Sequence, residues 1–206
     1  MDVNAHATQL AQSNARRNLI SNAHFVTLDV TSSDFTHTVA STFALNNEAM
    51  AVPSTTCLVP PFDLIVSNPP YISEHQWSAL QPEVRLWEDA SALVCADRGL
   101  SILRSIAGTA RHLLRPPLAA ATGARDARTP QLVMEFGDDW QTLPLTSILE
   151  ESGFGGVTTH HDSYGRARWI SGYHLGQNRD VHFACSASGR VPRTEKDSWK
   201  LALAPL

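Results

Sequence analysis

An apolar run around residue 65 is the clearest feature in the hydrophobic pattern of the chain. Leu64–Val66 is continuous and favours β-structure, as in a strand that is buried on both faces. Ser67–Pro70 follows at once and ends the strand, because its two prolines cannot donate ladder hydrogen bonds. The pattern therefore predicts a buried strand that stops in a rigid polar turn.

Helical and strand-like segments alternate along the chain. Helical patterns occur at residues 4–18, 34–45, 98–114 and 138–152, and strand-like runs at 25–28, 131–136, 157–161 and 168–173. We expect a short helix or turn at 73–80 and a polar connection at 81–85. The alternation predicts an α/β fold with a mainly parallel sheet. The last two strands are close in sequence, which predicts an antiparallel pair at one edge.

The sequence changes character after Gly176. Residues 177–206 are polar and show no pattern of a packed element, so we expect a disordered tail behind one domain at 1–176. An exposed loop is predicted after the helical pattern at 34–45, up to residue 61, and another at 115–130, since proline and small polar residues are frequent there.

Composition excludes several classes of protein. The formal net charge of −4 argues against a protein that coats nucleic acid. Cys57, Cys95 and Cys185 are scattered without zinc-type spacing, which favours a reducing compartment and predicts no metal site. No apolar run reaches the length of a membrane span, and the first residues lack a secretory pattern, so no membrane partner is expected.

The turn after the predicted strand offers groups that recognise a ligand. Ligands of open α/β sheets bind at the carboxyl ends of strands. Asn68 supplies a side-chain amide, the prolines leave carbonyls outside any ladder, and Tyr71 adds an aromatic ring. The alternative is that Asn-Pro-Pro is only a turn, since both residue types are common in loops.

Two acidic residues end neighbouring predicted strands. Asp2 lies at the start of the chain and Asp29 ends the run at 25–28. One carboxylate could accept the hydroxyls of a ribose and the other the amino group of an adenine. The alternatives are a frayed terminus for Asp2 and a turn residue for Asp29.

Three further candidates have ordinary structural explanations. Adjacent histidines in His160–Asp162 point to opposite faces of a strand, which disfavours a shared metal ion. Glu135 lies near the carboxyl end of a strand and could contact a ligand, form a salt bridge or cap a helix. Glu83 and Arg85 could shape a substrate loop or belong to a solvated loop.

The pattern resembles the class I S-adenosylmethionine-dependent methyltransferases. Within them it is similar to the family that methylates a glutamine side chain in peptide chain release factors. The resemblance covers residues 1–174 and rests on these segments: Asp2-Val3, Asp29-Val30, Asp63–Ile72 with its Asn-Pro-Pro-Tyr signature, Gln81–Arg85, Leu132–Gly137 and Gly165–Arg168. Asn-Pro-Pro-Tyr is shared with adenine-N6 methyltransferases, so Gln81–Arg85 favours the release-factor family.

The resemblance implies a Rossmann-like fold and a division of roles. S-adenosylmethionine is expected to contact Asp2, Asp29, Val30 and Asn68. Asn68–Tyr71 would hold the glutamine amide of a release factor's Gly-Gly-Gln loop, and Asn68, Pro69 and Tyr71 are the expected catalytic residues. The Asn68 side-chain oxygen and the Pro69 carbonyl can accept the two amide hydrogens, while Tyr71 stacks on the flat amide.

One feature departs from the family. The family builds its cofactor site on a glycine-rich loop after the first strand, but the first glycine here is Gly99. We therefore expect a sheet that lacks the first strand and this loop, with Met1 inside the second strand. The chain is then a fragment, an inactive short form, or a form that another chain completes.

Three functions remain open at this stage. The leading one is methyl transfer to a release-factor glutamine, inactive if the missing loop is essential. The alternatives are an adenine-N6 methyltransferase on nucleic acid and a non-catalytic remnant that acts through a partner. The loops at 41–61 and 115–130 are typical of a eukaryotic chain, which favours the mitochondrion over the bacterial cytoplasm.

Overall fold

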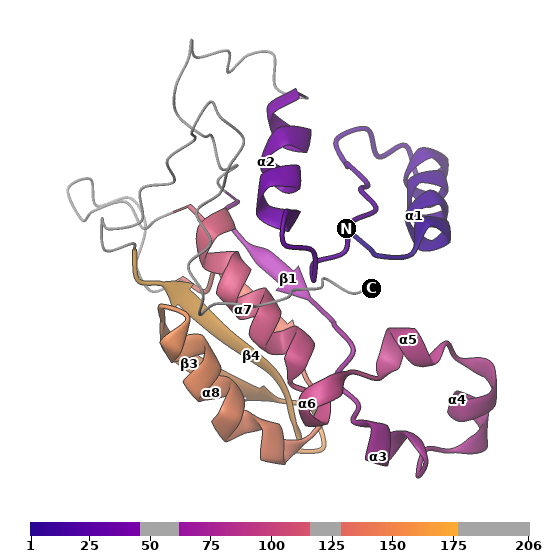
Figure 1. The fold of residues 1–206 in the computed structure, drawn as a ribbon, viewed down its shortest axis with the longest axis vertical. Helices are drawn as coiled ribbons and strands as arrows, with labels where there is room; N and C mark the ends of the chain where they lie inside the picture. The colour runs from indigo at the N-terminus through magenta and orange to yellow at the C-terminus, as the bar shows by residue number, and fades with distance from the viewer. Residues whose placement is uncertain (46–61, 116–128, 177–206) are drawn as a thin grey trace.

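The computed structural model describes residues 1–45, 62–115 and 129–176, and its centre is a four-stranded sheet (Figure 1). The strands are β1 (Ile65–Ser67), β2 (Leu132–Glu135), β3 (Phe154–His161) and β4 (Ala167–His174), in the order β1-β2-β4-β3. β1 and β2 are parallel, whereas β4 is antiparallel to both β2 and β3. The predicted α/β sheet with an antiparallel pair at one edge is confirmed, and β4 lies one place in from the edge strand β3. Among the described strands one pair is parallel and two are antiparallel, so the sheet is mixed and not mainly parallel as predicted.

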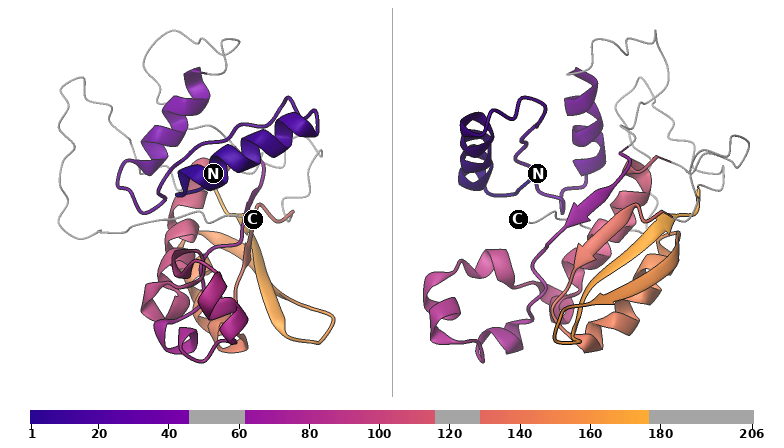
Figure 2. Two further views of the ribbon diagram at one scale, coloured as in Figure 1. Left: turned by 90° about the vertical axis from the view of Figure 1, so that its right-hand side faces the viewer. Right: turned by 180° about the vertical axis from the view of Figure 1, so that it is seen from behind.

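Two amphipathic helices, α7 (Ser101–Leu113) and α8 (Thr142–Glu151), lie side by side on one face of the sheet (Figures 1 and 2). Helical spacing brings Leu103, Ile106 and Ala110 of α7 onto one buried face. These side chains pack with Leu132 and Met134 of β2 in the main core. Burying a leucine or isoleucine side chain stabilises the fold by about 1.5–3 kcal/mol.

The N-terminal part forms a second, smaller core. Helix α1 (Ala5–Arg17) begins where the side chain of Asn4 accepts hydrogen bonds from the first turn, as predicted. Helix α2 (Phe35–Leu45) contributes Phe35, which is buried with Val30 and Leu113. The strand predicted at 25–28 is reduced to one parallel bridge between Asp2 and Thr27.

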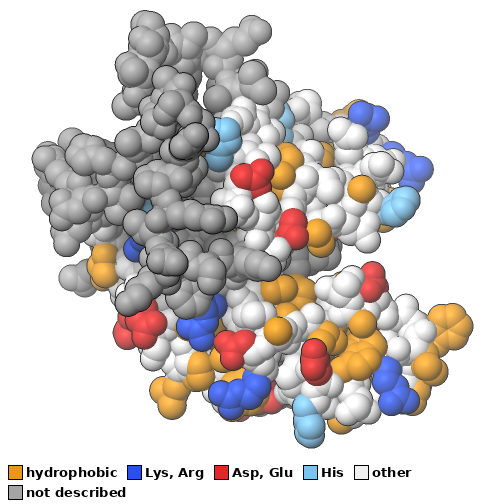
Figure 3. Space-filling model, viewed as in Figure 1, with side chains coloured by type: hydrophobic (Ala, Val, Ile, Leu, Met, Phe, Trp, Pro, Cys, Tyr) orange, Lys and Arg blue, Asp and Glu red, His pale blue; other side chains and the backbone are white. Residues whose placement is uncertain are grey.

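The segment Ser73–Val94, which we call the arm, projects from the body of the molecule (Figures 1 and 2). It contains α3 (Glu74–Trp77), α4 (Pro82–Trp87) and α5 (Ala90–Leu93). The polar connection predicted at 81–85 is therefore wrong, because Pro82 at the first helical position suits a helix start. Leu86 and Trp87 are largely exposed, and apolar side chains are visible over the arm in Figure 3.

A bridge closes the base of the arm. The amide of Ile72 donates to the carbonyl of Leu93 at 2.9 Å, and the amide of Cys95 donates to the carbonyl of Ile72 at 2.9 Å. The short helix α6 (Ala96–Gly99) follows, with three successive residues at positive φ. Helix α7 therefore begins at Ser101 and not at residue 98, where the periodicity had placed its start.

A turn of 3₁₀ helix, η3 (Asp139–Gln141), connects β2 to α8. Pro144 is the third residue of α8, inside the first turn as predicted, where its missing N–H is not needed. None of the helices in the described ranges is long and apolar enough to cross a membrane. The predicted loops at 46–61 and 116–128, the tail at 177–206, Cys57 and Cys185 lie outside the described residues.

Candidate active site

The predicted ligand-binding turn, Asn68–Tyr71, lies at the carboxyl end of β1. Pro69 and Pro70 are buried, and Asn68 is half-buried. Among the described residues, the side-chain amide of Asn68 makes no hydrogen bond, so its oxygen and nitrogen remain available to a ligand. The preceding hydroxyl, Ser67 Oγ, is also buried without a hydrogen-bond partner in the described part of the chain. Unused polar groups therefore gather at this end of β1.

Tyr71 is held by residues that follow the neighbouring strand. Its hydroxyl donates a hydrogen bond to Glu135 Oε1 at 2.9 Å. Its ring lies against Gly137, where a Cβ atom would come within 2.6 Å of Tyr71 Cδ2. Burial, and then the charge of Glu135, raise the pKa of Tyr71 to about 12, so the phenol stays neutral and donates at pH 7.

The buried side chain of Gln141 joins three segments at this site. Its Nε2 donates to the carbonyl oxygens of Tyr71 at 3.1 Å and Gly99 at 3.3 Å. Its Oε1 accepts from the amides of Gly137 at 3.0 Å and Asp138 at 3.2 Å. Sequence reasoning missed Gln141, because a glutamine soon after a strand carries no distinctive local signal.

Gly99 fits closely against the same turn. Its φ of 85° lies in the left-handed region, and a Cβ atom there would collide with the carbonyl oxygen of Tyr71. Asp97 and Arg98 also have positive φ, which turns the chain so that Gly99 reaches Tyr71. The backbone beside the Asn-Pro-Pro-Tyr turn therefore has space for glycine alone.

The two predicted nucleoside-binding acids are brought near each other by the N-terminal bridge. Asp2 pairs with Thr27, and Asp29 lies two residues further along the second segment. Asp2 is 5% exposed and its Oδ1 accepts from the amide of Asn4 at 2.7 Å. Asp29 is exposed and its Oδ1 accepts from the amide of Thr31 at 2.7 Å. Both carboxylates thus also stabilise local turns.

Val30, the third predicted cofactor residue, is fully buried in the second core with Phe35 and Val39. This position gives Val30 a packing role directly behind Asp29. A cofactor that binds at this point would contact the exposed Asp29 and would not reach the buried Val30.

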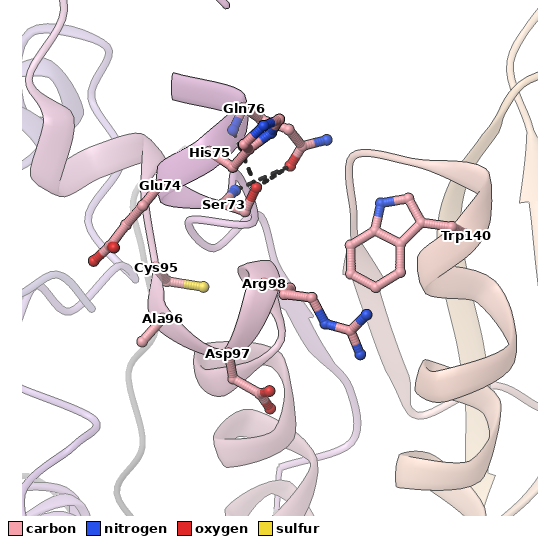
Figure 4. Close-up of a pocket in the computed structure, with 9 residues that line it drawn as sticks. All are labelled: Ser73, Glu74, His75, Gln76, Cys95, Ala96, Asp97, Arg98 and Trp140. Carbon is pink, nitrogen blue, oxygen red and sulfur yellow. Dashed lines mark hydrogen bonds between the residues drawn. The ribbon is translucent and has the colours of Figure 1, made fainter. Parts of the chain in front are cut away.

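A pocket of about 500 Å³ lies beside the Asn-Pro-Pro-Tyr turn (Figure 4). It is formed by the base of the arm, α6 and η3, and the side chain of Arg98 extends toward Trp140. The guanidinium carbon of Arg98 lies 5.2 Å from the centre of the Trp140 ring, within the range of a cation–π contact. Residues 68–71 do not line this pocket, so it neighbours the predicted site without containing it.

The remaining candidates make contacts that explain them structurally. His160 Nε2 shares a hydrogen bond with Ser171 Oγ at 2.8 Å, and the ring of His160 stacks on Trp169. Asp162 forms a salt bridge of 3.1 Å with Arg166. Within the described ranges, no group of three or more histidine, cysteine or acidic residues could hold a metal ion.

The predicted substrate-loop residues belong to the arm. Arg85 Nη1 donates to the carbonyl of Ser78 at 3.3 Å, which ties α4 to the segment after α3. Glu83 lies in the first turn of α4 and is exposed. Arg85 therefore stabilises the arm, and both residues lie in a different segment from the turn that holds Asn68.

The fold and the position of this turn define the class of the protein. A parallel β1–β2 pair is extended by the antiparallel β4 and by β3, with helices packed on the sheet and a polar turn at the carboxyl end of β1. This arrangement is consistent with the class I methyltransferase fold.

Comparison with known proteins narrows this class. No protein-family model matches the chain. It is 39% identical over 109 residues to the release factor glutamine methyltransferase of Cereibacter sphaeroides. The aligned region covers 53% of this chain and 34% of that protein. It is 39% identical over 115 residues to the enzyme of the same name from Chlorobaculum tepidum, covering 55% of this chain and 32% of that protein. A human protein named MTRF1L release factor glutamine methyltransferase is 34% identical over 96 residues, covering 47% of this chain and 28% of that protein.

These similarities confirm the resemblance to the release-factor family, which Gln81–Arg85 favoured over the adenine-N6 methyltransferases that share the Asn-Pro-Pro-Tyr motif. The chain is related to the release factor glutamine methyltransferases. It spans about a third of the length of the curated relatives that it matches.

Proposed function

We propose that this chain carries the amide-binding half of an active site that methylates the N5 side-chain nitrogen of a release-factor glutamine. The observation that carries the proposal is the half-buried Asn68, whose side-chain amide makes no hydrogen bond among the described residues. It stands in a turn made rigid by two buried prolines, next to a neutral Tyr71. The names of the related proteins support this substrate.

The turn can orient an amide that is a poor nucleophile. The Asn68 side-chain oxygen and the Pro69 carbonyl accept its two hydrogens and direct its nitrogen toward the methyl group, with reacting atoms about 3 Å apart. The same two oxygens stabilise the positive charge that grows on the nitrogen during transfer. The half-buried Tyr71 can present the remaining surface of its ring to the flat amide.

Proton removal needs no strong base. The nitrogen becomes far more acidic once it has gained a methyl group, so its proton leaves readily after transfer. With a pKa of about 12, the Tyr71 phenol is protonated at neutral pH and donates to Glu135. Tyr71 therefore acts by position and contact in this mechanism and does not accept the proton.

The described residues fit one end of S-adenosylmethionine. When bound, this cofactor supplies the electrophilic methyl group. The exposed carboxylate of Asp29 and the nearby Asp2 are suited to ribose hydroxyls and an adenine amino group. No glycine precedes Gly99, so residues 1–67 offer no glycine for a close backbone approach to the methionine end. The described residues therefore match the nucleoside end of the cofactor and not its methionine end.

We further propose that residues 1–176 act as one methyltransferase domain, that the partner is the Gly-Gly-Gln loop of a release factor, and that the compartment is the mitochondrion. The relatives come from bacteria and from human, which leaves a bacterial cytoplasm as the alternative compartment. Fluorescent tagging of the full-length gene product in its own cells decides between the two compartments.

The test of function uses the full chain with S-adenosylmethionine and a release factor. Calorimetry measures cofactor binding, and mass spectrometry of the Gly-Gly-Gln peptide detects the gain of one methyl group. We expect Asn68→Ala to lower the rate by about 100-fold, the effect of removing one well-placed transition-state contact. The matched control is Asn14→Ala on the exposed side of α1, which should leave the rate unchanged.

Two results would contradict the proposal. A folded chain that binds no cofactor acts as a non-catalytic remnant. A chain that methylates adenine in nucleic acid while leaving the release factor unmodified has the other substrate class that shares the Asn-Pro-Pro-Tyr motif.

A further inference from the structure

The Gln141 amide uses all of its hydrogen-bonding capacity for backbone groups. It is 1% exposed, with two donated and two accepted bonds of 3.0–3.3 Å. The four groups belong to the turn after β1, the turn before α7 and the turn after β2. A side chain with this arrangement fixes three loops relative to one another at the carboxyl edge of the sheet.

The donor side of this amide acts on the main chain of the proposed site. The carbonyl oxygens of Tyr71 and Gly99 both point at the single NH₂ group of Gln141. Gly99 is packed so tightly against Tyr71 that no side chain fits between them. Without this donor, both carbonyl oxygens would lose the hydrogen bond that Gln141 gives them.

The acceptor side acts on the surface beneath the Tyr71 ring. Gln141 Oε1 holds the amides of Gly137 and Asp138, and Gly137 is the residue against which the ring lies. The carbonyl and the ring of Tyr71 are therefore both placed through one side chain. The Tyr71 hydroxyl is fixed separately by Glu135.

We propose that Gln141 is a positioning residue for amide methylation, which sets the Asn-Pro-Pro-Tyr turn by holding the Tyr71 carbonyl and the Gly137 amide together. The inference rests on the proposed function for its catalytic consequence. Gln141 does not touch the substrate in this role. It keeps Tyr71 and the adjoining acceptors of Asn68 and Pro69 in the geometry that in-line transfer requires.

The opposite end of β2 provides a matched control. Gln131 immediately precedes the strand, donates from Nε2 to the carbonyl of Arg115 at 2.9 Å and accepts at Oε1 from the amide of His174 at 3.2 Å. Gln131 and Gln141 thus both connect backbone groups of separate segments through the two ends of one amide. Only Gln141 reaches the turn that contains Tyr71.

The test compares Gln141→Glu with Gln131→Glu. The carboxylate keeps an acceptor for the Gly137 and Asp138 amides but has no donor for the Tyr71 and Gly99 carbonyls. We expect Gln141→Glu to lower kcat at least ten-fold with unchanged cofactor affinity, and Gln131→Glu to keep kcat within two-fold. Burial raises the pKa of the new carboxyl, and its protonated form is again a donor. The kcat of Gln141→Glu relative to wild type should therefore recover as pH falls.

A spectroscopic measurement is independent of activity. The sequence has three tyrosines, so labelling the phenol carbon of tyrosine with ¹³C gives three NMR signals, and Tyr71→Phe identifies the one from Tyr71. We expect this signal to shift in Gln141→Glu and to stay in place in Gln131→Glu. If the Tyr71 signal shifts in Gln141→Glu but the wild-type chain shows no methylation, the proposed function is refuted and the positioning role of Gln141 is retained.

Two results would overturn the inference. In the first, folded Gln141→Glu keeps both its kcat and its Tyr71 signal. In the second, Gln141→Glu and Gln131→Glu lose kcat equally and in proportion to their loss of stability, which indicates a general effect on folding.

Discussion

Tyr71 and Asp29 are both predicted site residues, but the contacts that hold them come from very different distances along the chain. The partners of Tyr71 are Glu135 and Gln141, which are 64 and 70 residues away. The carboxylate of Asp29 bonds to Thr31, and that of Asp2 to Asn4, each two residues away. The geometry of the amide half therefore depends on distant parts of the core, while the carboxylates of the nucleoside half are held by short local turns and only their backbones are joined by the Asp2–Thr27 bridge.

The largest effect should come from Gly99→Ala. The new methyl group collides with the Tyr71 carbonyl and the backbone needs a positive φ, so we expect a loss of about 3 kcal/mol or more in unfolding free energy. Urea denaturation measures this loss. The control is Gly108→Ala in α7, where no atom lies within 4 Å of the added Cβ, and a gain of up to about 1 kcal/mol is expected. Equal effects of the two changes would refute the tight packing of Gly99 on the turn.

Acid should weaken the end of β2 that lies away from Tyr71. Burial, and then the charge of Arg111, lower the pKa of His112 to about 4, and the same causes lower the pKa of His174. Because an unfolded histidine titrates near 6.5, the stability that the neutral form of these two histidines contributes is fully present above that pH. Stability falls as pH drops from about 6.5 to 4, by about 2 kcal/mol for His112 after allowing for partial exposure.

His112→Gln tests the source of this acid sensitivity. Urea unfolding at several pH values should give a flatter dependence for the variant than for the wild type. The NMR signal of Tyr71 should stay in place over the same range until the whole domain unfolds. An early change at Tyr71 would show that the two ends of β2 are coupled more strongly than their separate contacts indicate.

A smaller loss is expected for Tyr71→Phe. The change removes the hydroxyl that donates to Glu135 and should lower the unfolding free energy by about 1–2 kcal/mol. Tyr164→Phe, at an exposed position, should stay within about 0.5 kcal/mol of wild type. Thermal or urea unfolding of both variants measures how much the hydrogen bond between Tyr71 and Glu135 contributes to the unfolding free energy.

The smallest change in stability is expected for Asp29→Asn. Asparagine keeps the oxygen that accepts from Thr31, so the unfolding free energy should change by less than about 0.5 kcal/mol. Loss of the carboxylate should lower the affinity for S-adenosylmethionine by about ten-fold, or about 1.4 kcal/mol, as measured by calorimetry. Asp89→Asn is the control, because Asp89 caps α5 through the same two-residue spacing but lies in the arm. Equal affinities of the two variants for S-adenosylmethionine would show that Asp29 does not belong to the cofactor site.

The sequence was informative where a local rule decides the structure. Asn4 predicted the start of α1, the Leu64–Val66 run with its prolines predicted the strand and turn at the site, and Pro144 predicted the first turn of α8. The predicted burial of that strand on both faces is wrong, because β1 is an edge strand of the described sheet and Leu64 and Val66 are exposed. The helix α4 was missed because its few apolar residues give no helical period. The delayed start of α7 was missed because no local sequence signal predicts positive φ at residues 97 and 98, which lead into the tightly packed Gly99.

The candidate site was predicted only in part, for a related reason. Asn68 and Tyr71 were recognised because they are consecutive with a distinctive turn. Glu135 was recognised as a residue near a strand end, without its partner. The roles of Gln141, Gly99 and Gly137 depend on which loops the parallel pair β1–β2 brings together, and no spacing in the sequence encodes those contacts.

The bridge between Ile72 and Val94 separates the arm from the turn below it. Both ends of the arm are fixed at this point, and Gln76 adds a further attachment by donating from Nε2 to Asp138 Oδ2 at 3.2 Å. A structural change in α4 therefore reaches Tyr71 through the base of the arm and through the turn after β2. Gln81–Arg85, which carries part of the family resemblance, lies beyond both attachments, so it can be altered separately from the turn that holds the proposed chemistry.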